Sequence, residues 1–317
     1  MKISILDGFT LFQSDIDWKL LKSFGDVIYF DRIENDQIPS ELHDSTILIT
    51  NKFVLNETNL AQFSYLKLII VSATGYNCVD TNYCKSKGIQ VANVPNYGTY
   101  SVAQHAMALL LNYTNAVEIH AQSVKDGEWV TCKDFSYQKK PLIELYGKTM
   151  GILGMGAIGS AFAKMCQSLG MKIIYAHTKN LHLPDLEYVS IEKLAQDSDF
   201  ISLHCPLNAQ TNQIINNKFL AHVKKNLVLI NTSRGGLINS QDLADALNQD
   251  TISAALLDVL EVEPPTNADP LLKAKNCSIT PHNAWISFEA RSRIVQIVKN
   301  IIENYQIHLV CQLNVIN

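Results

Sequence analysis

The chain has 317 residues, which at about 100 to 200 residues per domain favours two domains with substantial hydrophobic cores. Hydrophobic residues make up 47% and charged residues 18% of the chain, a globular composition that excludes a largely disordered protein. The 26 basic residues are outnumbered by 30 acidic ones, for a formal charge of -4. No basic cluster could neutralise a nucleic-acid backbone, so we expect no nucleic-acid partner.

The apolar segments are too short for a membrane protein. Asp7 interrupts the first one, and no later run approaches the roughly 18 apolar residues of a membrane-spanning helix. The seven cysteines are odd in number and include no CxxC pair, which argues against a disulfide framework and a zinc site and favours reduced thiols. We therefore predict a soluble, cytoplasmic protein that binds neither a membrane nor a metal.

Short β-rich segments alternate with helical patterns along the whole chain, which predicts an α/β protein with parallel sheets. The first series comprises five strands, expected near residues 3–6, 27–30, 46–49, 68–71 and 90–92. A second series of five strands is expected near residues 149–153, 172–175, 200–203, 227–230 and 253–257. Each series predicts one doubly wound sheet.

Two longer helices are predicted outside these series. Pro95 and Gly98 mark a turn, and residues 101–113 have the length and composition of a buried helix. The first domain boundary is therefore expected near Gly98. After Trp285, apolar residues recur at spacings of three and four behind Ser287, which predicts a terminal helix with this serine as its N-cap.

A glycine motif lies between the first strand of the second series and the helical pattern that follows it. Gly154, Gly156 and Gly159 form GxGxxG, in the strand–turn–helix context that this motif requires. Gly154 permits a tight turn, Gly156 lets a pyrophosphate approach the backbone, and Gly159 lets helix and strand pack closely. The helix N-terminus, beginning with Ala157 and Ile158, offers free amides and a positive dipole. The motif predicts a dinucleotide site; the alternative is a glycine-rich turn that merely packs.

The residues after the next strand bear on the identity of this dinucleotide. About twenty residues after the glycine motif, NAD-binding domains carry an acidic residue for the ribose hydroxyls. Here His177, Thr178 and Lys179 occupy that region. They would not repel a 2′-phosphate, and Thr178 and Lys179 could bind it, which gives NADP(H) a slight preference over NAD(H). The alternative is an ordinary surface turn, with NAD held by other contacts.

Nearly every strand of the second series ends in a glycine or polar residue. Because ligands of open α/β sheets bind outside the carboxyl ends of the strands, we expect these residues to converge on one cofactor. Polar strand ends without function are the alternative. The residues concerned are Gly154, His177, His204, Asn231, Thr232, Ser233 and Asp258.

Three charged or titratable residues follow this edge in the sequence: Arg234, Glu263 and His282. Arginine can hold a carboxylate with a planar set of donors. Histidine can supply the proton that a ketone oxygen needs as hydride arrives. A glutamate paired with that histidine would orient the ring and keep it charged near neutral pH. Taken singly, each has a structural alternative: a surface ion pair, a solvated loop carboxylate and a satisfied core histidine.

The ordered motifs of the chain resemble the D-isomer-specific 2-hydroxyacid dehydrogenase family, closest to its glycerate dehydrogenase or hydroxypyruvate reductase branch. The resemblance covers essentially the whole chain and includes several motifs in order. These are SATGYNCVD at 72–80, VPNYGTYSVAQ at 94–104, GKTMGILGMGAIG at 147–159, LHCPL at 203–207, NTSRGGLI at 231–238, LDVLEVEPP at 257–265 and TPHNAW at 280–285.

The resemblance implies roles for the residues singled out above. Arg234 would bind the substrate carboxylate and carbonyl, His282 would be the acid/base, and Glu263 its partner. The loop of Thr74, Gly75 and Tyr76 would offer backbone amides to the substrate carboxylate. Further cofactor contacts would come from Asp258, Thr232 and Ala284 near the nicotinamide, and from His204, Cys205 and Pro206 beside the adenosine half. Ser233 is a further expected cofactor contact.

The resemblance also implies an architecture. A Rossmann NAD(P)-binding domain over residues 99–287 would be inserted into a flavodoxin-like substrate domain formed by residues 1–98 and 288–317. A homodimer would form through the long region after Gly98. The sequence departs from the family pattern at His177, at Asn96 where glycine is common, and at Leu260 and Asn283. Asn96 is tolerable in a left-handed conformation, which asparagine accepts.

We therefore predict reversible NAD(P)H-dependent reduction of a small 2-keto acid, hydroxypyruvate or glyoxylate, to the D-2-hydroxy acid. A D-lactate-type dehydrogenase stays open. Phosphoglycerate dehydrogenase is the nearer rival, but the chain ends at Asn317 without an appended regulatory domain, and its first-domain loop shows no phosphate-binding cations. The rival from another class is a nucleotide-sensing, corepressor-like binding protein, which can retain the same three residues. Turnover of a keto acid distinguishes it from an enzyme.

Overall fold

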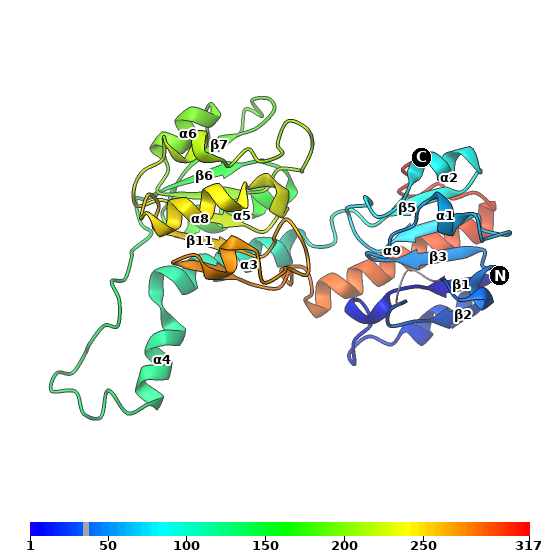
Figure 1. Ribbon diagram of the computed structural model, residues 1–317, viewed down its shortest axis with the longest axis horizontal. Coiled ribbons are helices and arrows are strands. Elements are labelled where there is room, and N and C mark those ends of the chain that lie inside the picture. The colour runs from blue at the N-terminus through cyan, green and yellow to red at the C-terminus, as the bar shows by residue number, and fades with distance from the viewer. Residues whose placement is uncertain (34–37) are drawn as a thin grey trace. The chain divides into compact units, whose positions relative to one another are not determined.

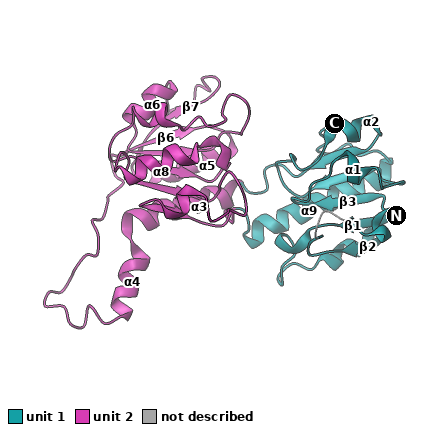
Figure 2. Ribbon diagram, viewed as in Figure 1, with its two compact units in different colours: residues 1–98, 285–317 teal, residues 99–284 magenta. Residues whose placement is uncertain are grey.

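The computed structural model describes residues 1–33 and 38–317 and divides the chain into two compact units (Figure 2). Unit 1 comprises residues 1–98 and 285–317, and unit 2 comprises residues 99–284. The second division thus falls three residues before the predicted one at 287/288. Trp285 belongs to unit 1 because its ring packs edge-on against Tyr97, with ring centroids 6.1 Å apart.

Unit 1 is built on a five-stranded parallel sheet in the order β2-β1-β3-β4-β5. This is the flavodoxin-like doubly wound order, with its topological switch point between β1 and β3. The predicted strands of this series are confirmed to within one residue: β1 Lys2–Ile5, β2 Asp26–Tyr29, β3 Ile47–Thr50, β4 Leu68–Val71 and β5 Gln90–Asn93.

Both faces of this sheet are covered, because alternate residues of its strands are apolar on each side. The terminal helix α9, Phe288–His308, covers one face through Ile294, Val298 and Ile301. Its predicted N-cap is confirmed, since the Ser287 side chain accepts the backbone N–H of Ala290. The remaining helical segments of unit 1 are η1 Gly8–Thr10, η2 Trp18–Phe24, η3 Ser40–Leu42, α1 Glu57–Leu60 and α2 Thr81–Ser86.

Unit 2 contains a seven-stranded parallel sheet in the order β12-β11-β10-β9-β6-β7-β8. The central strands follow the Rossmann order, with the switch point between β6 and β9. The five predicted strands are confirmed to within one residue, but the expectation that the second sheet has only five was wrong. The strands are β6 Thr149–Leu153, β7 Lys172–Ala176, β8 Glu187–Tyr188, β9 Phe200–Leu203, β10 Val228–Asn231, β11 Ala254–Leu257 and β12 Cys277–Ile279.

The two missed strands are the edges of the sheet. Strand β8 has two exposed residues and β12 has three residues, so neither carries an apolar run from which a strand could be predicted. Each exists only because a neighbouring strand, β7 or β11, offers its free backbone groups.

Helices cover both faces of this sheet (Figure 1). On one face α3, Thr99–Asn115, packs with α5, Ala157–Ser168, through residues such as Ala106 and Phe162. On the other face lie α6, Ile191–Asp197, α7, Asn217–Leu220, and α8, Ser240–Asn248. Two short segments, η4 Gly235–Leu237 and η5 Pro270–Lys273, complete the unit. The predicted buried helix at 101–113 is thereby confirmed as the greater part of α3.

One part of unit 2 stands away from its sheet. Helix α4, Val117–Lys125, and the loop of residues 126–142 that follows it extend outward (Figure 1). We call residues 117–142 the arm. Its internal contacts are polar, such as the hydrogen bond of 2.7 Å between Ser123 Oγ and the Tyr137 hydroxyl. Its apolar residues are largely bare: Val130 is 88% and Phe135 93% exposed.

In residues 1–33 and 38–317, no helix is long and apolar enough to cross a membrane. No group of three or more His, Cys, Asp or Glu side chains in the same residues could hold a metal ion. The seven cysteines of the described chain are free.

Candidate active site

Three glycines shape the turn between β6 and α5. Gly154 has a φ of +99°, and a Cβ there would lie 2.5 Å from the backbone nitrogen of Cys205. A Cβ on Gly159 would lie 2.2 Å from the carbonyl oxygen of Gly154, so α5 packs directly on the turn. Within the described chain, a Cβ on Gly156 would meet nothing within 4 Å. The outer glycines permit close packing, and the middle one leaves the open cradle that a phosphate requires.

Helix α5 begins at this cradle. Gly156 is its N-cap residue, and no side chain caps the helix. The backbone N–H groups of Ala157, Ile158 and Gly159 belong to the first turn, where they have no intrahelical acceptors. Together with the helix dipole, these donors favour an anion. A dinucleotide pyrophosphate fits this set of donors.

The residues after β9 lie across the switch point from the glycine turn. His204 Nε2 is 2.8 Å from Ser202 Oγ, and its ring packs against Phe162 with centroids 5.3 Å apart. Burial lowers the pKa of His204 to about 4, so the imidazole is neutral. Its Nδ1 is buried and has no partner in the described part of the chain. The predicted contacts Cys205 and Pro206 follow it, and Cys205 forms the wall beside Gly154.

The segment after β7 carries no carboxylate. His177 is half-buried, whereas Thr178 and Lys179 are exposed. The Thr178 hydroxyl lies 3.2 Å from His177 Nδ1, and the Tyr188 hydroxyl donates to the backbone carbonyl of His177 at 3.3 Å. The segment that follows β7, where NAD-binding domains carry an acidic residue, therefore begins with neutral and cationic groups.

Thr232 and Ser233 follow β10. The Thr232 hydroxyl is buried and lacks a hydrogen-bond partner among the described residues. A buried hydroxyl of this kind is costly unless a ligand satisfies it. The Ser233 hydroxyl instead donates to the carbonyl of Leu203 at 2.7 Å and ties the ends of β9 and β10 together.

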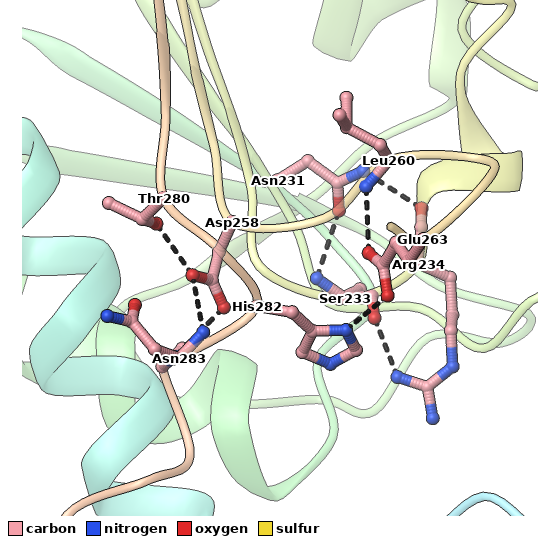
Figure 3. Close-up of polar contacts among 10 residues, drawn as sticks. Asn231, Ser233, Arg234, Asp258, Leu260, Glu263, Thr280, His282 and Asn283 are labelled. Carbon is pink, nitrogen blue, oxygen red and sulfur yellow. Dashed lines mark hydrogen bonds and ion pairs between the residues drawn. The ribbon is translucent and has the colours of Figure 1, made fainter. Parts of the chain in front are cut away.

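Arg234 is held by its own backbone neighbourhood (Figure 3). Its Nη1 donates to the carbonyl of Ser233 at 2.7 Å, and Asn231 Nδ2 donates to the carbonyl of Arg234 at 2.9 Å. The half-buried side chain forms no ion pair with any carboxylate that the structure describes. The described structure therefore does not contain the surface ion pair that was the alternative for Arg234. The guanidinium keeps donors for an anionic ligand.

Glu263 and His282 form a hydrogen-bonded pair. His282 Nδ1 lies 2.5 Å from Glu263 Oε2, and Glu263 Oε1 accepts the backbone N–H of Leu260 at 2.9 Å. The two side chains are 33% and 27% exposed. Both carboxylate oxygens are thus engaged, which fixes the imidazole ring (Figure 3). Because Nδ1 is bonded to Glu263, acid–base chemistry would use the other ring nitrogen, Nε2. Such a pair suits general acid–base catalysis.

Asp258, at the end of β11, binds the backbone that carries His282. Its Oδ1 accepts the N–H of Asn283 at 3.0 Å, and its Oδ2 accepts the N–H of Ala284 at 2.9 Å. The residue is 1% exposed. The predicted cofactor contacts Asp258 and Ala284 are thus bonded to each other, directly beside the candidate acid/base.

The loop of Thr74, Gly75 and Tyr76 lies in unit 1, after β4. Asn93 Nδ2 donates to the Thr74 carbonyl at 2.8 Å, and the Thr74 hydroxyl donates to the Val94 carbonyl at 3.1 Å. These bonds fix the loop against the end of β5. In the described chain the backbone N–H groups of these three residues donate to no acceptor. An anion could accept them.

The sequence analysis missed a role for Asp7, which it treated only as the end of an apolar segment. Asp7 accepts three consecutive backbone N–H groups, those of Asn51, Lys52 and Phe53, at 2.7, 2.6 and 2.8 Å. Burial raises the pKa of its carboxyl, although these three bonds oppose that effect. The residue fixes the loop after β3 at the switch point of unit 1, and its place at the end of β1 was the available signal.

Asn96 and His282 both have left-handed backbone conformations. Asn96 has a φ of +59°, so it occupies the left-handed region where glycine is common. Asparagine accepts this conformation, so the residue is tolerated in place of glycine. His282 shares this conformation, with a φ of +51°.

Comparisons with known proteins agree with this geometry. Residues 107–284 match the model of the D-isomer specific 2-hydroxyacid dehydrogenase, NAD binding domain. The chain is 44% identical over 311 residues to a hydroxypyruvate reductase from Blautia hydrogenotrophica, covering 96% of this chain and 97% of that protein. It is 36% identical over 269 residues to a glycerate dehydrogenase from Methylorubrum extorquens, covering 84% of each.

A solved structure extends the similarity to the whole fold. An NADPH-dependent glyoxylate/hydroxypyruvate reductase from Sinorhizobium meliloti, in complex with citrate, superposes with a TM-score of 0.85 at 25% identity. The alignment covers 99% of this chain and 97% of the other. With the glycine cradle, the histidine–glutamate pair and these relatives taken together, the chain belongs to the D-isomer-specific 2-hydroxyacid dehydrogenase family of NAD(P)-dependent oxidoreductases.

Proposed function

We propose that the chain catalyses NAD(P)H-dependent reduction of hydroxypyruvate or glyoxylate to the D-2-hydroxy acid, and the reverse oxidation. The observation that carries this proposal is the 2.5 Å hydrogen bond between His282 Nδ1 and Glu263 Oε2. It supplies an oriented acid/base at the sheet edge where the glycine cradle lies. The relatives named hydroxypyruvate reductase and glycerate dehydrogenase support this choice of substrates.

His282 supplies the proton in the reductive direction. The nicotinamide supplies hydride to the carbonyl carbon when the cofactor is bound. As that carbon becomes tetrahedral, the carbonyl oxygen gains negative charge and accepts the proton from His282 Nε2. Glu263 stays bonded to Nδ1 throughout, which holds the ring orientation and stabilises the imidazolium. In the oxidative direction, the same nitrogen accepts the hydroxyl proton.

Arg234 is the proposed anchor of the substrate carboxylate. Its planar donors suit two carboxylate oxygens, and a donor near the carbonyl polarises it toward hydride attack. In unit 1, we assign the free amides of Thr74, Gly75 and Tyr76 to the same carboxylate. Unit 1, residues 1–98 and 285–317, would then act as the substrate domain, and unit 2, residues 99–284, as the cofactor domain.

The proposed cofactor is NADP(H) in preference to NAD(H). Gly154, Gly156 and Gly159 with the first amides of α5 would hold the pyrophosphate, and Thr232, Asp258 and Ala284 the nicotinamide half. The argument for NADP(H) is the segment His177–Thr178–Lys179, where the absence of a carboxylate removes the charge that repels a 2′-phosphate. Lys179 would supply a positive charge there.

The arm supports a homodimer as the proposed assembly. Val130 and Phe135 are 88% and 93% exposed, although hydrogen bonds such as Trp129 Nε1 to the Phe135 carbonyl at 3.2 Å stabilise the loop that presents them. Large apolar side chains held in an ordered exposed segment are typical of an interface. A second copy presenting the same arm would cover them in a two-fold symmetric contact.

The test is oxidation of NADPH and NADH, followed at 340 nm, with hydroxypyruvate, glyoxylate, pyruvate and phosphohydroxypyruvate. We expect turnover with hydroxypyruvate or glyoxylate, and a higher kcat/KM with NADPH than with NADH. The His282→Ala variant serves as the matched control, and it should lose roughly a hundredfold or more in kcat while still binding NADPH.

Four outcomes would contradict parts of this proposal. Turnover confined to pyruvate would indicate a D-lactate-type enzyme, and turnover confined to phosphohydroxypyruvate would indicate a phosphoglycerate dehydrogenase. NADPH binding without turnover of any acid would favour the sensing role. A higher kcat/KM with NADH would reject the cofactor preference alone.

A further inference from the structure

A histidine outside the proposed catalytic set lies within hydrogen-bonding distance of its supporting residues. His105 projects from α3, and its Nε2 is 3.0 Å from Thr280 Oγ1. Thr280 Oγ1 is in turn 2.6 Å from Asp258 Oδ1. The same Asp258 oxygen lies 3.5 Å from His105 Nε2. The His105 side chain is 22% and the Asp258 side chain 1% exposed, so the three groups meet largely away from solvent.

The three side chains form a chain of hydrogen bonds, and the Asp258 carboxylate determines which group donates and which accepts at each step. The Asp258 carboxylate can only accept hydrogen bonds, so the single proton of Thr280 is directed to it. The alternative acceptor for that proton, the Leu257 carbonyl, is more distant at 3.3 Å. A lone pair of Thr280 Oγ1 therefore faces His105, and His105 Nε2 must carry a hydrogen and donate it.

Thr280 and Asp258, two members of this hydrogen-bond chain, also accept hydrogen bonds from the backbone on both sides of His282. Before His282, Thr280 accepts the His282 backbone N–H at its carbonyl, at 2.9 Å. After His282, the amides of Asn283 and Ala284 are held by Asp258. His282 itself has a φ of +51°, a left-handed conformation that is uncommon for residues other than glycine.

We propose that His105 is a positioning residue for the reaction. Through Thr280 it holds Asp258, and through Asp258 it holds the left-handed backbone of His282, so that His282 Nε2 meets the substrate carbonyl in the right place. The proposal rests on the proposed function, because it assigns His105 to the acid/base step of that reaction. Nothing in the argument requires His105 to touch substrate or cofactor.

The sequence alone gives little indication of this role. His105 lies in a helix in which the nearby residues Val102, Ala103, Ala106 and Met107 are buried and apolar. Its partner Thr280 is 175 positions away in the sequence. Only the packing of α3 beside the ends of β11 and β12 brings the imidazole to the hydroxyl.

The test uses variants that remove one donor at a time with little change in shape. His105→Phe removes the ring donor, and Thr280→Val removes the hydroxyl. We expect each to lower kcat with hydroxypyruvate about tenfold to a hundredfold, the scale of an acid/base misplaced by roughly an ångström. The KM values for the keto acid and NADPH should change by less than about twofold, because the ligand contacts remain.

Two further variants separate a positioning role from a general packing role. Thr280→Ser keeps the hydroxyl and should restore most of the kcat lost in Thr280→Val. The double variant His105→Phe with Thr280→Val should be no slower than the worse single variant, because both act through one chain. Gln104→Ala, an exposed neighbour on the same helix, is the control and should leave kcat unchanged.

A separate measurement does not depend on turnover. Long-range nitrogen-15 NMR of the histidine rings should show hydrogen on His105 Nε2 in the unmodified protein, with its signal shifted in Thr280→Val. Hydrogen on Nδ1 alone would overturn the inference even in an active enzyme. Additive losses in the double variant, no rescue by serine, or an unchanged kcat in His105→Phe would also overturn it. Lack of turnover by the unmodified protein would instead reject the proposed function.

Discussion

At the scale of single residues, the candidate site is defined by which donors and acceptors are already engaged. Glu263 uses one carboxylate oxygen for Leu260 and the other for His282. The Arg234 side chain donates only to the backbone carbonyl of Ser233 in the described chain. The histidine is therefore fixed by the protein, whereas the guanidinium keeps donors for a ligand. This difference predicts different kinetic effects for the two residues.

Replacing Glu263 with Gln should weaken the acid/base without removing it. The amide keeps the size of the side chain but loses the negative charge that stabilises the His282 imidazolium. We therefore expect the reductive kcat with hydroxypyruvate to fall about tenfold or more. Steady-state kinetics measure this loss, and an unchanged kcat would reject the pairing.

Replacing Arg234 with Lys should affect the substrate more than the cofactor. Lysine keeps the charge but has no planar pair of donors for a carboxylate. We expect the KM for hydroxypyruvate to rise about tenfold or more, with the NADPH dissociation constant unchanged. Steady-state kinetics and a fluorescence titration with NADPH measure the two quantities. An equal weakening of both ligands would show that Arg234 binds the cofactor instead.

At the scale of elements, the turn from β6 to α5 combines two requirements that different glycines meet. Gly159 lies against the carbonyl oxygen of Gly154, so it governs how closely the helix packs. Gly156 faces open space and has a φ of -79°, which alanine also adopts. Gly159 should therefore matter for the stability of the fold, and Gly156 for binding of the ligand.

The matched substitutions Gly159→Ala and Gly156→Ala test this division. At position 159 the new methyl group would displace α5, and we expect a loss of roughly 1–3 kcal/mol, seen as a lower Tm. At position 156 the Tm should stay within about a degree, while the NADPH dissociation constant rises because the methyl group occupies the cradle. Thermal unfolding and NADPH titration distinguish the two variants. A lower Tm for Gly156→Ala with unchanged NADPH binding would contradict the assignment.

At the scale of the whole molecule, the arm is the part of unit 2 whose exposed apolar residues do not pack against the hydrophobic core of that unit. The sheet and helices of unit 2 bury their apolar residues on both faces, but the arm leaves Val130 and Phe135 bare. Hydrogen bonds keep the segment ordered without covering these side chains. A second copy is the proposed cover, which makes the mass in solution the decisive observable.

Sedimentation velocity should give a mass twice that of the chain at micromolar concentration. The double variant Val130→Asp with Phe135→Asp places two charges in the proposed interface and should raise the dimer dissociation constant about a hundredfold or more. Tyr65→Asp is the matched control, because Tyr65 is also largely exposed but lies in unit 1. Equal dissociation in the control, or a single-chain mass for the unmodified protein, would reject the arm as the interface.

The sequence by itself determined features that depend on local pattern. Buried parallel strands are continuous apolar runs, so ten of them were predicted to within one residue. Ser287 was predicted as an N-cap because this preference is a property of the residue type. The glycine motif was visible because its spacing follows from a turn of fixed geometry.

The tertiary structure decided what depends on partners distant in the sequence. The edge strands β8 and β12 form only because β7 and β11 offer unpaired backbone groups. Asp7 binds the loop at Asn51, and His105 meets Thr280, across separations that no local pattern encodes. Residue types suggested that Glu263, Arg234 and His282 carry the chemistry. Only the folded sheet edge shows that Glu263 fixes His282 while Arg234 keeps its donors, because hydrogen bonds depend on distance in space.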